Sequence, residues 1–203
     1  IAINKEYIEI QKYAFRKYKI KTVENKHTHL VPEELEQLER LSLTGKHMKL
    51  QKSLDAFLFC CYAGMRYSDF TNLSKKNIVD INQETWLIYK SVKTGTEVRL
   101  PLYLLFAGKG IVILNKYRNN LEDFFRLRDN SNINKDLIII AKLAGLSKKI
   151  SFHTARHTNA TLLIYNGVNI TTVQKLLGHK SVKTTQVYTN IMDMTIVHDL
   201  EKM

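Results

Sequence analysis

Residues 153–190 read HTARHTNATLLIYNGVNITTVQKLLGHKSVKTTQVYTN. The spacing of apolar residues in this stretch predicts helices over 153–166 and 170–177. Gly167 and Gly178 follow these helices at the position where a left-handed residue commonly ends a helix. The C-terminal part of the chain is therefore expected to be helical, with Tyr188 on a further helix.

The same stretch places three basic side chains on one helix face. His153, Arg156 and His157 are at i, i+3 and i+4. A guanidinium presents a fixed fork of donors that matches two phosphate oxygens, and histidine exchanges a proton near neutral pH. Taken alone, such residues are more often surface residues. One tyrosine among ten is also more often a core or surface aromatic than a nucleophile.

The charge of the chain is strongly positive and unevenly distributed. Its 31 Lys and Arg outnumber its 19 Asp and Glu, which gives a formal net charge of +12. The 56 residues between Asp136 and Asp193 contain seven Lys or Arg, three His and no acidic residue. This pattern predicts contact with a polyanion, nucleic acid first, and leaves no carboxylate cluster there for a two-metal nuclease. The alternative is a solvated surface that happens to lack acids.

Length and composition are those of a globular domain. With 203 residues, 44% hydrophobic and 25% charged, the chain is not a disordered basic tail. The longest nearly uninterrupted apolar run, Ala56 to Met65, is about half as long as a membrane-spanning helix. Cys60 and Cys61 are adjacent in this run, which predicts reduced core residues and an intracellular protein. Because the chain begins at Ile1, we expect a fragment that lacks an N-terminal partner domain.

The remaining patterns predict an α+β fold that is mainly α-helical with a small three-stranded antiparallel sheet. Helices are expected over 32–42, 47–63, 66–73 and 134–144, and Gly64 is the expected C-cap of the second. Strands are expected near 78–81, 86–92 and 98–100, where β-branched and aromatic residues are bounded by turn formers. The segment 102–130 is also expected to be helical, but Gly108 and Gly110 leave its first helix unplaced.

Five motifs follow one another in the order AGMRYSDF at 63–70, VKTG at 92–95, HTARHT at 153–158, LGH at 177–179 and Tyr188. In order and spacing they resemble the catalytic domain of the tyrosine recombinases, the phage integrase family. The resemblance covers residues 28–192. Ala63 and Met65 in the first motif depart from the family's usual residues, and residues 102–130 match the family poorly. The resemblance implies that residues 1–27 are a linker and the remnant of a preceding DNA-binding domain. It also implies that residues 193–203 are a C-terminal tail that docks on a neighbouring protomer.

The resemblance implies roles for six side chains and requires neither a metal nor another cofactor. Two arginines clamp the scissile phosphate, on which attack builds negative charge. A hairpin lysine protonates the leaving 5′ oxygen, one histidine handles protons, and a second histidine donates a hydrogen bond to the phosphate. A tyrosine is the nucleophile that forms a 3′-phosphotyrosyl bond. In this order the residues are Arg66, Arg156, Lys93, His153, His179 and Tyr188.

Two of these positions, and one acidic residue near them, also have ordinary interpretations. Arg66 after a helix cap is often a partner of the helix dipole, and Lys93 beside Thr94 and Gly95 is often a plain turn residue. Asp69, the one acidic residue near a motif, has either a supporting role, as in the family, or a structural role as a cap or salt-bridge partner.

The activity implied by the resemblance is site-specific DNA recombination by a recombinase or integrase of a mobile element. The expected partner is double-stranded DNA, with a homotetramer on DNA, a monomer or weak oligomer without it, and accessory DNA-bending proteins. A bacterial cytoplasmic location is expected. The alternatives are a catalytically inactive DNA-binding relative and DNA relaxation of the type IB topoisomerase kind. A basic RNA-binding module has less support, because the sequence has no aromatic-bearing strand motif of the usual RNA readers.

Overall fold

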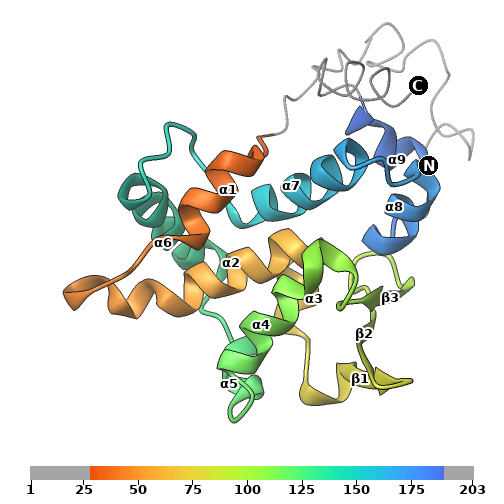
Figure 1. Cartoon of the computed structure of the whole chain (residues 1–203), viewed down its shortest axis with the longest axis horizontal. Coiled ribbons are helices and arrows are strands. Elements are labelled where there is room, and N and C mark those ends of the chain that lie inside the picture. The colour runs from red at the N-terminus through yellow and green to blue at the C-terminus, as the bar shows by residue number, and fades with distance from the viewer. Residues whose placement is uncertain (1–27, 190–203) are drawn as a thin grey trace, which may run out of the picture.

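Helix α2 (Gln51–Ala63) is the centre of the fold in the computed structural model, which describes residues 28–189 (Figure 1). Eleven of its thirteen residues are buried, so this helix belongs to the core on all sides. Helix α7 (Phe152–Tyr165) packs along it. Cys60 and Cys61 of α2 are free and fully buried, and burial raises the pKa of both thiols. Their prediction as core residues is confirmed.

Further helices surround this pair. The α-helices are α1 (Pro32–Glu39), α3 (Tyr67–Thr71), α4 (Lys109–Lys116), α5 (Leu121–Phe125), α6 (Asn130–Leu143), α8 (Ile170–Leu177) and α9 (Lys183–Gln186). Short 3-10 helices are η2 (Gly45–Leu50), η3 (Lys75–Asn77) and η4 (Leu105–Gly108).

Some helix boundaries differ from the predicted ones. Helix α6 begins four residues before the predicted start, because the Asp129 side chain accepts a hydrogen bond from the Asn132 backbone N–H and so forms an N-cap. Helix α1 ends three residues before the predicted end. In the segment 102–130, Phe106 and Ala107 have positive φ angles of 48° and 54°. Such angles are uncommon outside glycine, so no residue pattern could indicate the break before α4.

The sheet contains the three predicted antiparallel strands, β1 (Ile78–Ile81), β2 (Glu84–Lys90) and β3 (Glu97–Pro101), in the order β1-β2-β3. Leu87 pairs with Leu100 and Tyr89 pairs with Val98, and these four side chains are buried. The alternation places one face of β2 and β3 against the helices. Residues 91–96 form the turn that connects the end of β2 to the start of β3.

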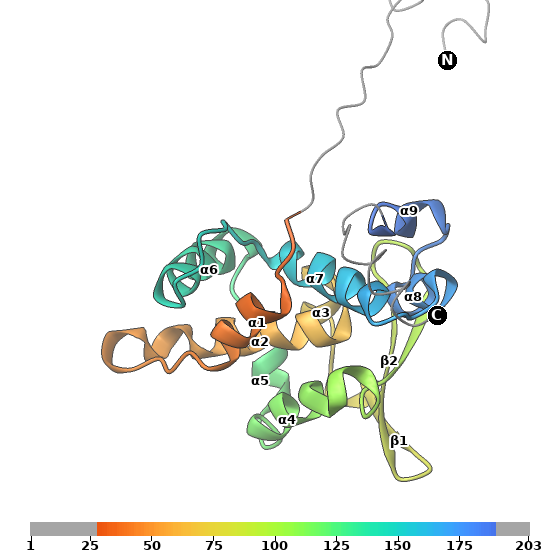
Figure 2. The same ribbon diagram turned by 45° about the horizontal axis from the view of Figure 1, so that its top comes forward.

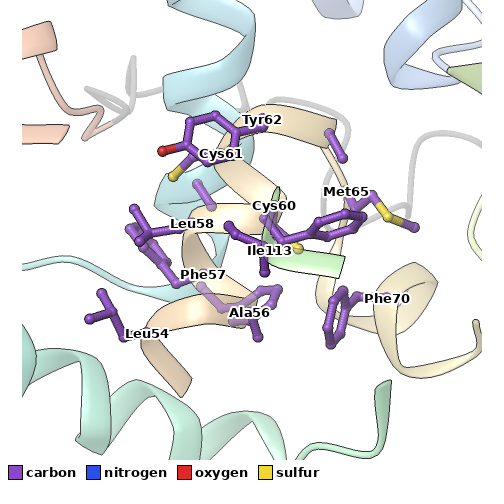
Figure 3. Packing of buried hydrophobic residues seen from close by; sticks show 14 of the residues in the cluster. Leu54, Ala56, Phe57, Leu58, Cys60, Cys61, Tyr62, Met65, Phe70 and Ile113 are labelled. Carbon is purple, nitrogen blue, oxygen red and sulfur yellow. The ribbon is translucent and has the colours of Figure 1, made fainter. Parts of the chain in front are cut away.

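An aromatic cluster joins α2 to the helices on its other side. Phe70 of α3 lies with its ring centroid 5.8 Å from that of Phe59 and 5.3 Å from that of Phe124. Figure 3 shows Phe70, Met65 and Ile113 beside the apolar side chains of α2. The burial of Met65 and Phe70 on both sides of Arg66 holds that segment rigidly against the core.

Both views place α8, α9 and the sheet at one end of the domain and α6 at the other (Figures 1 and 2). Across residues 28–189, none of the helices combines the length and apolarity needed to cross a membrane. The linker and domain remnant predicted at 1–27 and the tail predicted at 193–203 lie outside the described residues.

Candidate active site

Arg66 lies in the short connection between α2 and α3. Gly64 ends this helix in the left-handed conformation at φ 66°, as predicted, and Arg66 then caps α3 with an extended backbone at φ −80° and ψ 156°. Its guanidinium Nη1 donates to Ser91 Oγ at 3.2 Å and lies 3.5 Å from Asp69 Oδ2. The helix cap and these two partners set the direction of the Arg66 side chain.

Asp69 connects α3 to the turn between β2 and β3. Its fully buried carboxylate accepts hydrogen bonds from the Val92 backbone N–H at 2.8 Å and from Ser91 Oγ at 3.2 Å. Lys93 follows Val92 in this turn and is exposed. The contacts of Asp69 are therefore structural, and they hold Arg66 and the turn that carries Lys93 in a fixed relation.

The same turn is also anchored to α8. Thr94 Oγ1 donates to the carbonyl of Gly178, which ends α8 in the left-handed conformation. A Cβ at Gly178 would lie 2.6 Å from Val98 Cγ2 of β3, so both the backbone conformation and the close approach require glycine here. His179 follows Gly178 directly. The Lys93 turn and His179 thus share one anchor.

Arg156 is among the largest fully buried side chains of the described residues, at 1% exposure. Its Nη1 donates to the Gly64 carbonyl at 2.7 Å, and its Nη2 donates to the Leu177 carbonyl at 2.6 Å. One guanidinium therefore bridges the C-terminal ends of α2 and α8, where carbonyls lack helical partners. Burial lowers the pKa of Arg156 to about 10, with the positive charge of Arg66 adding to the effect. The side chain remains charged at neutral pH.

His179 is buried beside α9. Its Nδ1 lies 2.9 Å from the hydroxyl of Thr185, a residue with no exposed surface. Burial lowers the pKa of His179 to about 3, and the positive charges of Arg156 and Arg66 act in the same direction. At neutral pH the imidazole is uncharged. When the Thr185 hydroxyl donates to Nδ1, the Nε2 position carries the proton and can donate to a ligand.

Tyr188 lies in the turn that follows α9, which corrects its predicted place on a helix. The short α9 ends at Gln186, and the Tyr188 backbone N–H donates to the Thr185 carbonyl at 3.1 Å, an i→i−3 bond of a tight turn and not an α-helical bond. Tyr188 is 5% exposed, and its Oη lies 3.1 Å from Nδ1 of His157. Its ring lies parallel to that of His179 with the centroids 6.5 Å apart. His179 and Tyr188 therefore lie side by side in the site.

The charged and titratable groups of this cluster influence one another. Burial raises the pKa of Tyr188, and the positive charges of Arg156 and Arg66 oppose that effect. After burial and the two arginines, the charges of His153 and Lys93 also lower the pKa of His179. Side chains from α3, the β2–β3 turn, α7 and the segment after α8 therefore converge at one end of the domain. In residues 28–189, no group of three or more His, Cys, Asp or Glu side chains is placed to hold a metal ion.

Residues 28–194 match the model described as the Phage integrase family. The chain belongs to this family. The curated tyrosine recombinase of Pseudothermotoga lettingae is 30% identical to it over 179 residues, which cover 86% of this chain and 60% of that protein. Tyrosine recombinase XerA of Saccharolobus solfataricus is 34% identical over 134 residues, which cover 64% of this chain and 42% of that protein. The integrase-family chain thus spans about half the length of such relatives.

Solved structures of integrase-family proteins have the same fold. A lambda integrase tetramer bound to a Holliday junction matches with a TM-score of 0.71 at 20% identity, over 92% of this chain and 54% of that chain. XerA recombinase matches with a TM-score of 0.64 at 24% identity, over 94% of this chain and 68% of that chain. The predicted mainly helical fold with one three-stranded sheet is confirmed.

The predicted residues of this integrase-family domain lie around one site, and the roles assigned to them stay predictions. Arg66, Arg156 and His179 are held by the contacts given above, whereas Lys93 and His153 are exposed. The sequence interpretation missed Ser91 and Thr185, since a lone serine or threonine near a turn carries no distinguishing pattern. His157 was placed on the basic helix face but given no role of its own.

Proposed function

We propose that this domain cuts and rejoins DNA at specific sites through a covalent link to Tyr188, as the catalytic part of a site-specific recombinase carried by a mobile element. The observation that carries the proposal is the setting of the phenol. Tyr188 Oη is buried next to a histidine nitrogen; burial raises the pKa of the phenol, and the positive charges of Arg156 and Arg66 oppose part of that rise. This is the environment that an attacking phenol needs.

Arg66 and Arg156 bind the non-bridging oxygens of the scissile phosphate. Each arginine has five N–H donors, and Arg156 uses two of them on the Gly64 and Leu177 carbonyls. These two bonds hold the guanidinium in place before DNA arrives, so little reorganisation accompanies the attack. A fixed positive charge in a buried site stabilises the charge that develops on the phosphate more strongly than a mobile one in water. His179 donates a hydrogen bond to the phosphate through Nε2. His153, which is exposed on the first turn of α7, takes part in proton handling.

In the cleavage step, Tyr188 Oη forms a bond to phosphorus as the bond from phosphorus to the 5′ oxygen breaks. The phenol gives up its proton to a base of the site, and Lys93 supplies a proton to the leaving oxygen, because an alkoxide leaves poorly near neutral pH. The products are a 3′-phosphotyrosyl bond and a free 5′ hydroxyl. Since one phosphoester replaces another, the reaction needs no ATP. Attack by a 5′ hydroxyl from another strand reverses the step and completes strand exchange.

The wider setting of the domain is part of the proposal. Its partner is double-stranded DNA, since the net charge is +12 and related structures include a lambda integrase tetramer on a Holliday junction and a XerH recombinase bound to its difH substrate. We propose a tetramer on DNA, a further DNA-binding domain before residue 28, accessory DNA-bending proteins and a bacterial cytoplasmic location. The tail at 193–203 docks on a neighbouring protomer in that assembly.

The test is covalent capture of the protein on a nicked suicide substrate that carries a candidate recombination site. The reaction contains EDTA, and Tyr188→Phe is compared with Tyr165→Phe, a change near the far end of α7. We expect an SDS-stable protein–DNA adduct with the unaltered protein and with Tyr165→Phe, and no adduct with Tyr188→Phe.

Each of the other possible outcomes would support a different function or a different nucleophile. Tight DNA binding by the full-length protein without an adduct would establish an inactive DNA-binding relative. Relaxation of supercoiled plasmids regardless of sequence would establish a topoisomerase. An adduct that persists in Tyr188→Phe would place the nucleophile elsewhere.

A further inference from the structure

The second histidine of HTARHT is the residue in hydrogen-bond contact with the nucleophile. His157 Nδ1 lies 3.1 Å from Tyr188 Oη, and both residues are largely buried, at 7% and 5% exposure. The two side chains come from positions 31 residues apart, so the contact is made by the tertiary fold. A buried hydroxyl that faces a ring nitrogen at this distance shares one hydrogen bond with it, and the tautomer of the ring decides which atom donates.

Arg156 and His179, which also lie near the phenol, direct their side-chain hydrogen bonds to other partners. Arg156, adjacent in sequence, directs Nη1 and Nη2 to the Gly64 and Leu177 carbonyls. The Nδ1 of His179 lies against the Thr185 hydroxyl. His153, one helical turn before His157, stands edge-on to it with ring centroids 4.4 Å apart, and its side chain is exposed. His157 thus lies between the exposed histidine and the buried phenol.

We propose that His157 is a further catalytic residue of the strand-cleavage reaction: its Nδ1 accepts the hydrogen bond of the Tyr188 hydroxyl and takes that proton as the phenol attacks. This inference rests on the function proposed above. In the step, the O–H bond of Tyr188 breaks and an N–H bond forms at His157 Nδ1. The phenol oxygen bonds to phosphorus, and the 5′ oxygen leaves with the proton of Lys93. In rejoining, the imidazolium returns its proton to the departing phenolate.

The two histidines of the motif lie in different settings. His157 is buried at the nucleophile, whereas His153 is exposed on the first turn of α7, on the side open to an incoming phosphate. The phenol pKa, which burial raises, makes a base at this position useful, because an unassisted phenol is almost fully protonated near neutral pH.

The direction of the hydrogen bond can be measured without DNA. Isotope-labelled histidine and NMR of the ring nitrogens report which nitrogen carries the proton. We expect an unprotonated Nδ1 in neutral His157, with a chemical shift that changes in Tyr188→Phe. A protonated Nδ1 in the neutral ring would overturn the proposal whatever the reaction on DNA, because Nδ1 would then donate to the phenol.

The chemical role is tested by single-turnover cleavage of the nicked substrate. His157→Asn keeps an acceptor near the position of Nδ1 but cannot take a proton, so we expect DNA affinity within about twofold of the original and cleavage slowed about 100-fold. Incorporation of difluorotyrosine at position 188, whose phenol is more acidic, should restore about tenfold or more of that loss. Thermal melting and DNA binding of each variant show that it is folded.

The outcomes separate this proposal from the proposed function. A Tyr188-dependent adduct that forms at an unchanged rate in His157→Asn would keep the recombinase and discard His157 as a base. Failure of difluorotyrosine to restore the rate would also discard His157 as a base. Rescue of His157→Asn by a substrate with a bridging sulfur at the 5′ position would move the role of His157 to the leaving group. Absence of any adduct in the unaltered full-length protein would instead refute the recombinase itself, and His157 with it as a base for this reaction.

Discussion

Replacement of Gly178 by alanine should destabilise the domain through two separable effects. Gly178 has φ 63°, and alanine in the left-handed region costs about 1–2 kcal/mol. The new Cβ would also lie 2.6 Å from Val98 Cγ2, whereas carbon atoms in contact prefer about 3.5–4.0 Å. Relief of such overlap in a packed core costs about 1–3 kcal/mol. We therefore expect Gly178→Ala to lower the free energy of unfolding by about 2–5 kcal/mol.

Gly95→Ala is the matched control. Gly95 has a similar φ of 68°, but a Cβ there would meet nothing within 4 Å, so only the conformational cost of about 1–2 kcal/mol applies. Urea denaturation followed by circular dichroism measures both variants. The difference between them, about 1–3 kcal/mol, isolates the contact with Val98. Val98→Ala should cost less stability in the Gly178→Ala background than in the unaltered protein, because there it also removes the crowding methyl groups.

Equal stability of Gly178→Ala and Gly95→Ala would refute the reasoning, because it would mean that β3 is not packed on the end of α8.

The contact between Gly178 and β3 also affects the expected rate of DNA cleavage. Thr94 donates to the Gly178 carbonyl, so a shift at this point displaces both the Lys93 turn and His179. Gly178→Ala should therefore slow adduct formation even under conditions where it remains folded.

Three further predictions concern the charged groups of the site. Arg156→Lys loses at least one charge-assisted bond to a buried carbonyl, so its free energy of unfolding should fall by about 1.5–3 kcal/mol in urea denaturation. The free energy of unfolding of Arg66→Lys should fall by less. Equal losses in the two variants would contradict the bridging role of Arg156. His179 has a pKa of about 3 in the folded protein against an ordinary 6.5, so between these values only the unfolded chain binds the proton and stability should decline as pH falls through that window. His179→Asn should flatten this pH dependence in urea titrations, and an unchanged slope would assign the acid sensitivity to other groups. Lys93→Ala should bind DNA normally but cleave it about 100-fold more slowly. The cleavage rate should recover on a substrate with a bridging 5′ sulfur, because that sulfur leaves without a proton. Failure of this rescue would exclude Lys93 as the general acid.

Elements defined by local patterns were predictable from the sequence. The apolar run of α2 and the glycines at 64 and 178 identify two helix ends, because periodicity and the left-handed cap depend on neighbouring residues alone. The three strands were predictable for the same reason. The break at Phe106 and Ala107 was not, since those residues adopt positive φ only under the constraint of the surrounding packing.

The sequence by itself determined which side chains are candidates for the chemistry, because motif order and charge distribution are properties of the chain. Tertiary structure alone decided what each candidate touches. Arg156 donates to a carbonyl 92 residues away, and Asp69 accepts from a backbone amide 23 residues away. Tyr188 lies in hydrogen-bond contact with His157, 31 residues away. Such contacts follow from how α2, α7, α8 and the β2–β3 turn pack together. No local pattern encodes them, because a hydrogen bond depends on the distance between two atoms and not on their separation along the chain.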